Sequence, residues 1–178
     1  MGAWAGPYAV ASLLLVLAGL AKARDPRTTA GAFRTMGLRV PEAAVRAGGG
    51  LEAGLGVVAL TGVAWVAALV ALSYLAFSGF VAVALVRGLP IGSCGCFGKV
   101  DTPPSVLHLV VNGGAIVAAS AVALGASGGF RAVLADQPAF GVPFLAFVVA
   151  ATYLAYLALT VLPQLDSLRR AGRRASSS

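Results

Sequence analysis

Long uncharged stretches alternate with short charged segments along this chain, and they predict helices that cross a membrane. Four stretches contain no Asp, Glu, Lys or Arg: residues 1–21, 53–86, 102–130 and 137–165. A membrane-spanning helix needs about 20 mostly apolar residues. The first, third and fourth stretches therefore each predict one span, over residues 7–22, 105–124 and 140–162.

The second stretch is too long for a single span. As one helix its 34 residues would extend about 51 Å, against a hydrocarbon core of about 30 Å. Two helices fit better, over residues 44–61 and 65–87, with a turn at residues 61–63 and with Glu52 carried into the membrane. The alternative is one long bent helix, which would leave four spans instead of five.

With two helices in that stretch, the predicted fold is an all-α, polytopic transmembrane helical bundle. It has a four-helix core and a fifth, C-terminal span in a single domain, residues 1–165. The composition agrees, because 59% of the residues are hydrophobic and 11% are charged, whereas a soluble domain has about 25% charged residues. This excludes a disordered chain and a nucleic-acid-binding domain, and it predicts a multi-pass protein of the cell membrane with the lipid bilayer as partner.

The net charge of +7 is concentrated in two segments. Ten of the 13 basic residues lie in residues 22–46 and in the tail, residues 166–178. Basic segments stay in the cytoplasm, and five spans place both on one side, whereas four would separate them. We expect a short interfacial helix within residues 22–46 and a disordered tail.

The two cysteines, Cys94 and Cys96, are separated by Gly95 in a loop rich in Gly and Pro. A disulfide between them would close a very small ring and contribute little to the stability of the fold. A role in thiol–disulfide exchange therefore explains the cysteine pair better than a structural disulfide does. A metal site is a second hypothesis. Within one chain only His108 and Met36 could complete the ligand set, so we predict no metal site. Two-coordinate binding of Cu(I) by the cysteines remains an alternative. A third reading is a pair of buried, unreactive thiols.

A few polar residues interrupt the predicted spans. Ser105, His108 and Asn112 recur at i, i+3 and i+7, so they share one face of a helix. His108 is a candidate acid or base for a cysteine thiol, and Asn112 a candidate for a hydrogen bond between helices. Glu52 either relays a proton or clamps helices together.

We expect Glu52 to pair with Arg46, Arg87 or His108, and Lys22 to extend to the membrane surface, as Lys near helix ends commonly does. Helices in lipid associate by close approach at small residues. A Gly-x-x-x-Gly pair at residues 50 and 54 predicts such a contact.

The string Cys94-Gly95-Cys96-Phe97-Gly98, followed by a helix that bears Asn112, resembles the methylamine-utilisation MauE family, which is related to DoxX-like membrane proteins. Residues 18–26 and 52–56 extend the resemblance. It implies disulfide handling, with Gly95 and Phe97 supporting the cysteines. It also implies thioredoxin-like partners and a role in maturing a disulfide-rich exported enzyme subunit.

These observations favour a membrane thiol–disulfide oxidoreductase in which Cys94 and Cys96 cycle between dithiol and disulfide. The electron partner is a thioredoxin-fold protein, an exported disulfide-containing protein or a membrane quinone; no bound cofactor is required. A non-catalytic membrane chaperone or scaffold and a copper-handling protein are the rival hypotheses. Five spans place the cysteines at the cytoplasmic edge, whereas disulfide formation in an exported protein favours the outer side.

Overall fold

The computed structural model describes residues 3–89, 103–126 and 138–175, and in the last helix the side chains of residues 141–165. These residues form helices joined by turns, with no strand among them, which confirms the predicted all-α class. The helices are α1 (Ala5–Arg24), α2 (Pro26–Thr35), α3 (Glu42–Ala59), α4 (Ala64–Val86), α5 (Val106–Ala123) and α7 (Pro138–Ala175).

The long uncharged stretch divides into two helices as expected. α3 ends at Ala59 and α4 begins at Ala64. Between them Gly62 adopts φ +76°, a left-handed conformation that glycine takes without strain. The single bent helix is therefore wrong. α2 is the short helix expected within residues 22–46, and α7 continues through residues 166–175, where we expected a disordered tail.

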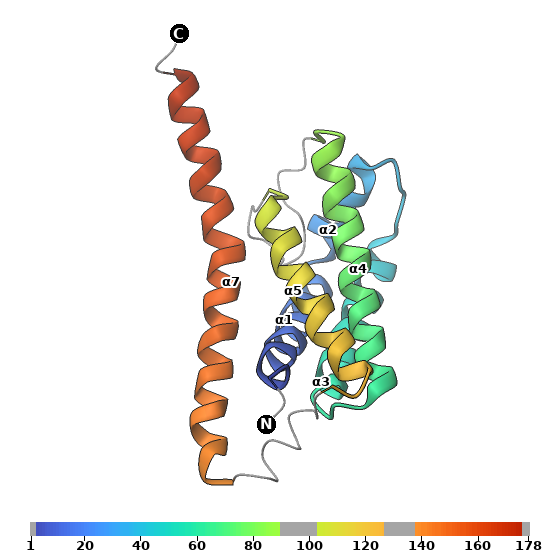
Figure 1. Ribbon diagram of the computed structural model, residues 1–178. Helices are drawn as coiled ribbons and strands as arrows, with labels where there is room; N and C mark the ends of the chain where they lie inside the picture. The colour runs from blue at the N-terminus through green and yellow to red at the C-terminus, as the bar shows by residue number, and fades with distance from the viewer. Residues whose placement is uncertain (1–2, 90–102, 127–137, 176–178) are drawn as a thin grey trace.

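The helices run alternately along one axis (Figure 1). α1, α4 and α7 run in one direction, and α3 and α5 return between them. At the end of the bundle where α4 finishes, the centres of the Phe33 ring in α2 and the Phe80 ring in α4 lie 5.6 Å apart. At the opposite end, where α1 and α7 begin, Phe144 of α7 lies beside Gly6 of α1. The basic segment that contains α2 and the basic end of α7 thus lie at the same end of the molecule, which we call the basic end.

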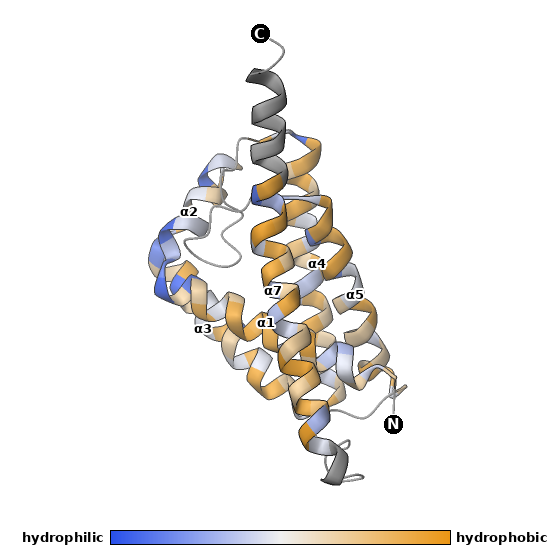
Figure 2. Cartoon of the chain, turned by 90° about the vertical axis from the view of Figure 1, so that its left-hand side faces the viewer, coloured by the Kyte–Doolittle hydropathy of each residue, from blue (hydrophilic) through white to orange (hydrophobic). Residues whose placement is uncertain are grey.

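Among the described helices, α1, α4, α5 and residues 141–165 of α7 are long and apolar enough to cross a membrane. α3 corresponds to the second predicted span, residues 44–61; it is not among these four helices, and it carries Glu42, Arg46 and Glu52 over a length of about 27 Å. Figure 2 shows mostly apolar residues along α4, α5 and α7 and polar ones gathered on α2. An outer surface of this kind fits contact with lipid. Its large exposed apolar side chains include Leu51, Trp65, Leu72, Val110 and Phe147.

The half of the bundle away from the basic end has a closely packed core. α1 contributes Tyr8, Ala11 and Leu15 to it. Tyr74 of α4 donates a hydrogen bond from its hydroxyl to the backbone oxygen of Ala11, at 2.6 Å, and so ties α4 to α1. The other helices contribute Ala59, Val66, Ala67, Val70, Ala115, Ala118, Ala119 and Val122.

Glycines let α1 and α3 approach closely. A Cβ atom built on Gly49 would lie 2.7 Å from the backbone oxygen of Gly19, and one on Gly56 would lie 2.6 Å from that of Ser12. Only a residue without a side chain fits at either position. The Gly50–Gly54 prediction is wrong, because both positions face open space. The interface uses the adjacent face of α3, which carries Gly49 and Gly56. The spacing of small residues along a helix does not tell which face turns toward its neighbour.

We expect Gly49→Ala to destabilise the protein by about 1–3 kcal/mol, because the added methyl group would force the α1 and α3 backbones apart. Gly50→Ala is the matched control: it faces open space and should be neutral or slightly stabilising. Thermal unfolding of the purified protein in detergent measures both. Equal losses in the two variants would contradict the proposed role of Gly49.

Candidate functional site

A partly buried ion pair joins α1 to α3 near the basic end. Lys22 Nζ donates a hydrogen bond to Glu52 Oε2 at 2.6 Å, and the two side chains are 9% and 21% exposed. The ammonium also lies 4.3 Å from the centre of the Phe77 ring on α4, a cation–π distance. The contact draws together one residue from each of three helices.

Two predictions about these residues were wrong. Lys22 does not extend to the membrane surface, because its side chain is buried between helices. Glu52 pairs with Lys22 and not with Arg46, Arg87 or His108. The close approach of α1 and α3 explains both differences, since it places the last turn of α1 directly beside the middle of α3.

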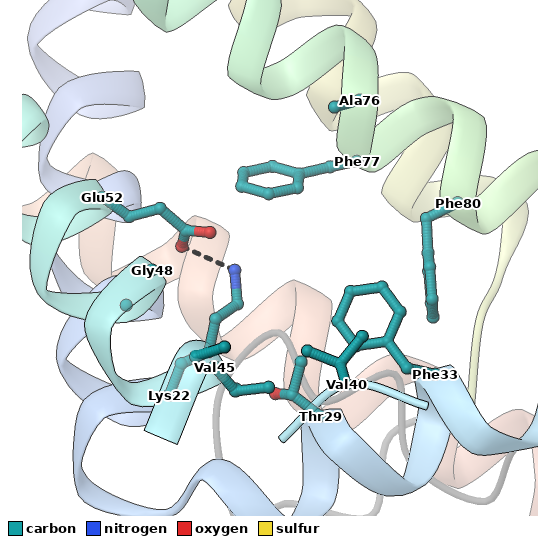
Figure 3. A pocket seen from close by; sticks show the side chains of 12 residues that line it. Lys22, Thr29, Phe33, Val40, Val45, Gly48, Glu52, Ala76, Phe77 and Phe80 are labelled. Atoms are coloured by element: carbon teal, nitrogen blue, oxygen red, sulfur yellow. Dashed lines mark hydrogen bonds and ion pairs between the residues drawn. The ribbon is translucent and has the colours of Figure 1, made fainter. Parts of the chain in front are cut away.

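The ion pair forms part of the wall of a cavity of about 370 Å³ (Figure 3). α2 and α3 close one side of it, and Phe77 and Phe80 of α4 close the other, with Phe33 of α2 facing Phe80. We call this cavity the α2–α4 pocket. Its lining residues are Lys22, Thr29, Phe33, Val40, Ala44, Val45, Gly48, Gly49, Glu52, Ala76, Phe77 and Phe80.

The predicted polar face of α5 is present and buried. His108 and Asn112 are 3% and 9% exposed. The Ser105 hydroxyl lies 2.9 Å from His108 Nδ1, as their i, i+3 spacing predicts. His108 Nε2 is buried, and among the described residues it has no hydrogen-bond partner. One ring nitrogen is therefore paired with the Ser105 hydroxyl, and the other has no partner among the described residues.

A second, narrow cavity of about 30 Å³ lies between the ion pair and the histidine. Lys22 and Phe77 line it from the side of the α2–α4 pocket, and His108 and Asn112 line it from α5. Leu159 of α7 lies at its edge. Lys22 and Phe77 consequently form a wall shared by the pocket and the polar face of α5.

Cys94, Gly95, Cys96 and Phe97 lie outside the described residues. Their chain leaves the bundle after α4, which ends at Val86, and rejoins it at α5, which begins at Val106. Both helix ends lie at the basic end (Figure 1). Among the residues that the structure describes, no three His, Cys, Asp or Glu side chains are grouped closely enough to hold a metal ion.

Sequence reasoning missed the aromatic lining of the pocket. Phe77 and Phe80 recur at i, i+3, a spacing that places them on one face of α4. In a helix that is apolar all round, this spacing does not distinguish a pocket lining from a lipid-facing surface. The role of Lys22 was easier to predict. Glu52 is an acidic residue inside the bundle, so it requires a cation from a neighbouring helix, and Lys22 is such a cation.

We expect Lys22→Met to destabilise the protein by roughly 3 kcal/mol, because it leaves the Glu52 carboxylate buried without its cation. The double variant Lys22→Met/Glu52→Gln should recover most of that loss, since neither charge remains. The single variant Glu52→Gln completes the cycle, and unfolding in detergent compares the wild type with the three variants. If the two single substitutions have additive effects, the residues do not interact.

Comparison with known proteins is consistent with this architecture. The comparisons with curated proteins and with solved structures gave no match. The family model described as methylamine utilisation protein MauE matches residues 1–126, which include α1 to α5, the cysteine loop and every candidate site residue. The match covers more than half of the chain. The protein therefore belongs to the MauE family of membrane proteins.

Proposed function

We propose that this protein is a membrane thiol–disulfide oxidoreductase of methylamine utilisation, with Cys94 and Cys96 as its redox pair. The observation that carries the proposal is the buried His108, whose Nε2 is free of partners among the described residues at the end of the bundle where the cysteine loop is attached. The Cys-Gly-Cys spacing supports it, because a strained bridge exchanges readily. A thioredoxin-fold or exported disulfide-containing protein is the proposed partner.

The exchange proceeds through a mixed disulfide. A thiolate of one protein attacks a disulfide sulfur of the other, and the S–S bond breaks as the new one forms. The second cysteine of the pair then displaces the partner, which leaves as a thiolate and takes up a proton. His108 accepts the proton from the attacking thiol and can return it to the departing one.

Single cysteine variants should trap the partner, because one thiol remains to attack and none remains to resolve the adduct. We expect Cys94→Ser or Cys96→Ser, but not Ser93→Ala, to accumulate a covalent species that a reductant removes. Non-reducing electrophoresis of membranes from methylamine-grown cells detects it. Absence of an adduct in both variants, with methylamine utilisation retained, would refute the redox function and favour a scaffold.

We also propose that the basic end faces the cytoplasm of a cell membrane, since Lys- and Arg-rich segments are retained there. A membrane-impermeant maleimide should then label the reduced cysteines from the cytoplasmic side of vesicles and not from the opposite side. Labelling from the outer side alone would reverse this orientation.

The same labelling assay tests His108. We expect His108→Gln to slow the reaction of the cysteines by roughly tenfold, because a base that increases the thiolate fraction is lost. Ser120→Ala, on the same helix, is the control and should leave the rate unchanged. Equal rates in all three proteins would remove His108 from the mechanism.

A further inference from the structure

We propose that the α2–α4 pocket binds the head group of an isoprenoid quinone. The pocket joins three properties: an aromatic lining, a partly buried ion pair with no net charge, and an opening among lipid-facing residues. Its role as the site of an electron acceptor rests on the redox function proposed above, whereas the binding itself does not.

The size and lining of the pocket suit a flat apolar ring. Its volume of about 370 Å³ falls within the usual range for small-molecule sites, about 300–1,000 Å³. Phe33, Phe77 and Phe80 present aromatic rings to it from two sides (Figure 3). Aromatic side chains bind rings well in stacked or edge-to-face geometry.

The ion pair selects a neutral ligand over an anionic one. Lys22 is already compensated by Glu52 at 2.6 Å, so a carboxylate or phosphate ligand would have to displace an internal anion. An ammonium carries three N–H donors. Glu52 accepts one, which leaves donors for a neutral carbonyl oxygen without breaking the pair.

Both redox forms of a quinone find a partner at this pair. A quinone carbonyl accepts a hydrogen bond from the Lys22 ammonium. A quinol hydroxyl donates one to the Glu52 carboxylate, whose two oxygens provide several acceptor sites. A site for a two-electron carrier must accommodate both the oxidised and the reduced form. The Lys22 donor for the quinone and the Glu52 acceptor for the quinol are both present at the pocket.

The pocket opens where a membrane-dissolved molecule can reach it. Ala44 of α3 and Ala76 of α4 line it, and both residues are exposed. Leu72 and Leu75, on the same helix as Ala76, are 59% and 57% exposed, as lipid-facing residues are. The small side chains at this rim leave space for an isoprenoid tail to lead from the pocket into the bilayer.

The redox step balances. A partner dithiol reduces the Cys94–Cys96 disulfide by the reverse of the exchange described above, and is itself oxidised to a disulfide. The two cysteine thiols then lose two electrons and two protons and form one S–S bond again. The quinone takes up the two electrons and two protons, and its carbonyl oxygens become hydroxyls. Lys22 and Phe77 separate the pocket from the cavity beside His108, so the quinone site adjoins the proposed proton acceptor of the thiols.

Filling the pocket tests the proposal. A Cβ atom on Gly48 would meet nothing within 4 Å, although Gly48 lines the pocket, so Gly48→Leu should fold and occupy the ligand's space. Gly50→Leu is the matched control, two residues along the same helix and facing open space outside the pocket. The probes are azido derivatives of short-chain ubiquinone and menaquinone, photolabelled onto full-length protein in lipid nanodiscs.

We expect saturable labelling of wild-type protein on α3 or α4. Gly48→Leu should weaken it at least about tenfold, equivalent to 1.4 kcal/mol, and Gly50→Leu should not change it. Unlabelled decylubiquinone should compete, whereas oleate should not. Equal labelling of both leucine variants, or competition by oleate as strong as by the quinone, would overturn the proposal and indicate a general lipid groove.

A cysteine-free variant, Cys94→Ser/Cys96→Ser, separates this proposal from the redox function. It should bind the quinone probe as the wild type does, because neither cysteine is needed for the pocket. If the wild type does not bind the quinone probe but the single cysteine variants still form partner adducts, the quinone-binding proposal alone is refuted. Binding without any thiol exchange would refute the redox function alone.

Discussion

The close approach of α1 and α3 is the constraint on which the remaining structure depends. Apolar helices in lipid gain no hydrophobic free energy by associating, so contact between backbones must supply the stabilisation. Gly19, Gly49 and Gly56 permit that contact, because no Cβ atom fits at any of them. The approach places Lys22 beside Glu52, and the resulting ion pair then holds the two helices together in a region where neither charge is tolerated alone.

The two ends of the bundle differ in how closely their helices pack. Away from the basic end, alanines, valines and the Tyr74–Ala11 hydrogen bond fill the space among the helices. Toward the basic end, α2 contacts α4 through Phe33 and Phe80, and the α2–α4 pocket opens among α2, α3 and α4. The closely packed half maintains the fold, and the hollow half collects the polar groups. The residues of the proposed chemistry thus lie toward the end of the molecule where the cysteine loop is attached.

The extent of the family match agrees with this division. It ends at residue 126, just after α5, so it contains the four-helix core and every candidate site residue. α7 lies outside the match and against the surface of α1, where Phe144 meets Gly6. The candidate site residues on α1 to α5 therefore lie within the matched region, and α7 packs beside it.

Features that depend on residues close together in the chain were predictable from the sequence. Uncharged length predicted the helices, Gly62 falls in the predicted turn, and the i, i+3 spacing placed Ser105 against His108. Tertiary structure alone decided that Gly49 and not Gly50 meets α1, that Lys22 pairs with Glu52, and that three phenylalanines enclose a pocket. The reason is physical: a helix that is apolar on every side carries little information about its own rotation, and only packing against its neighbours sets which face turns inward.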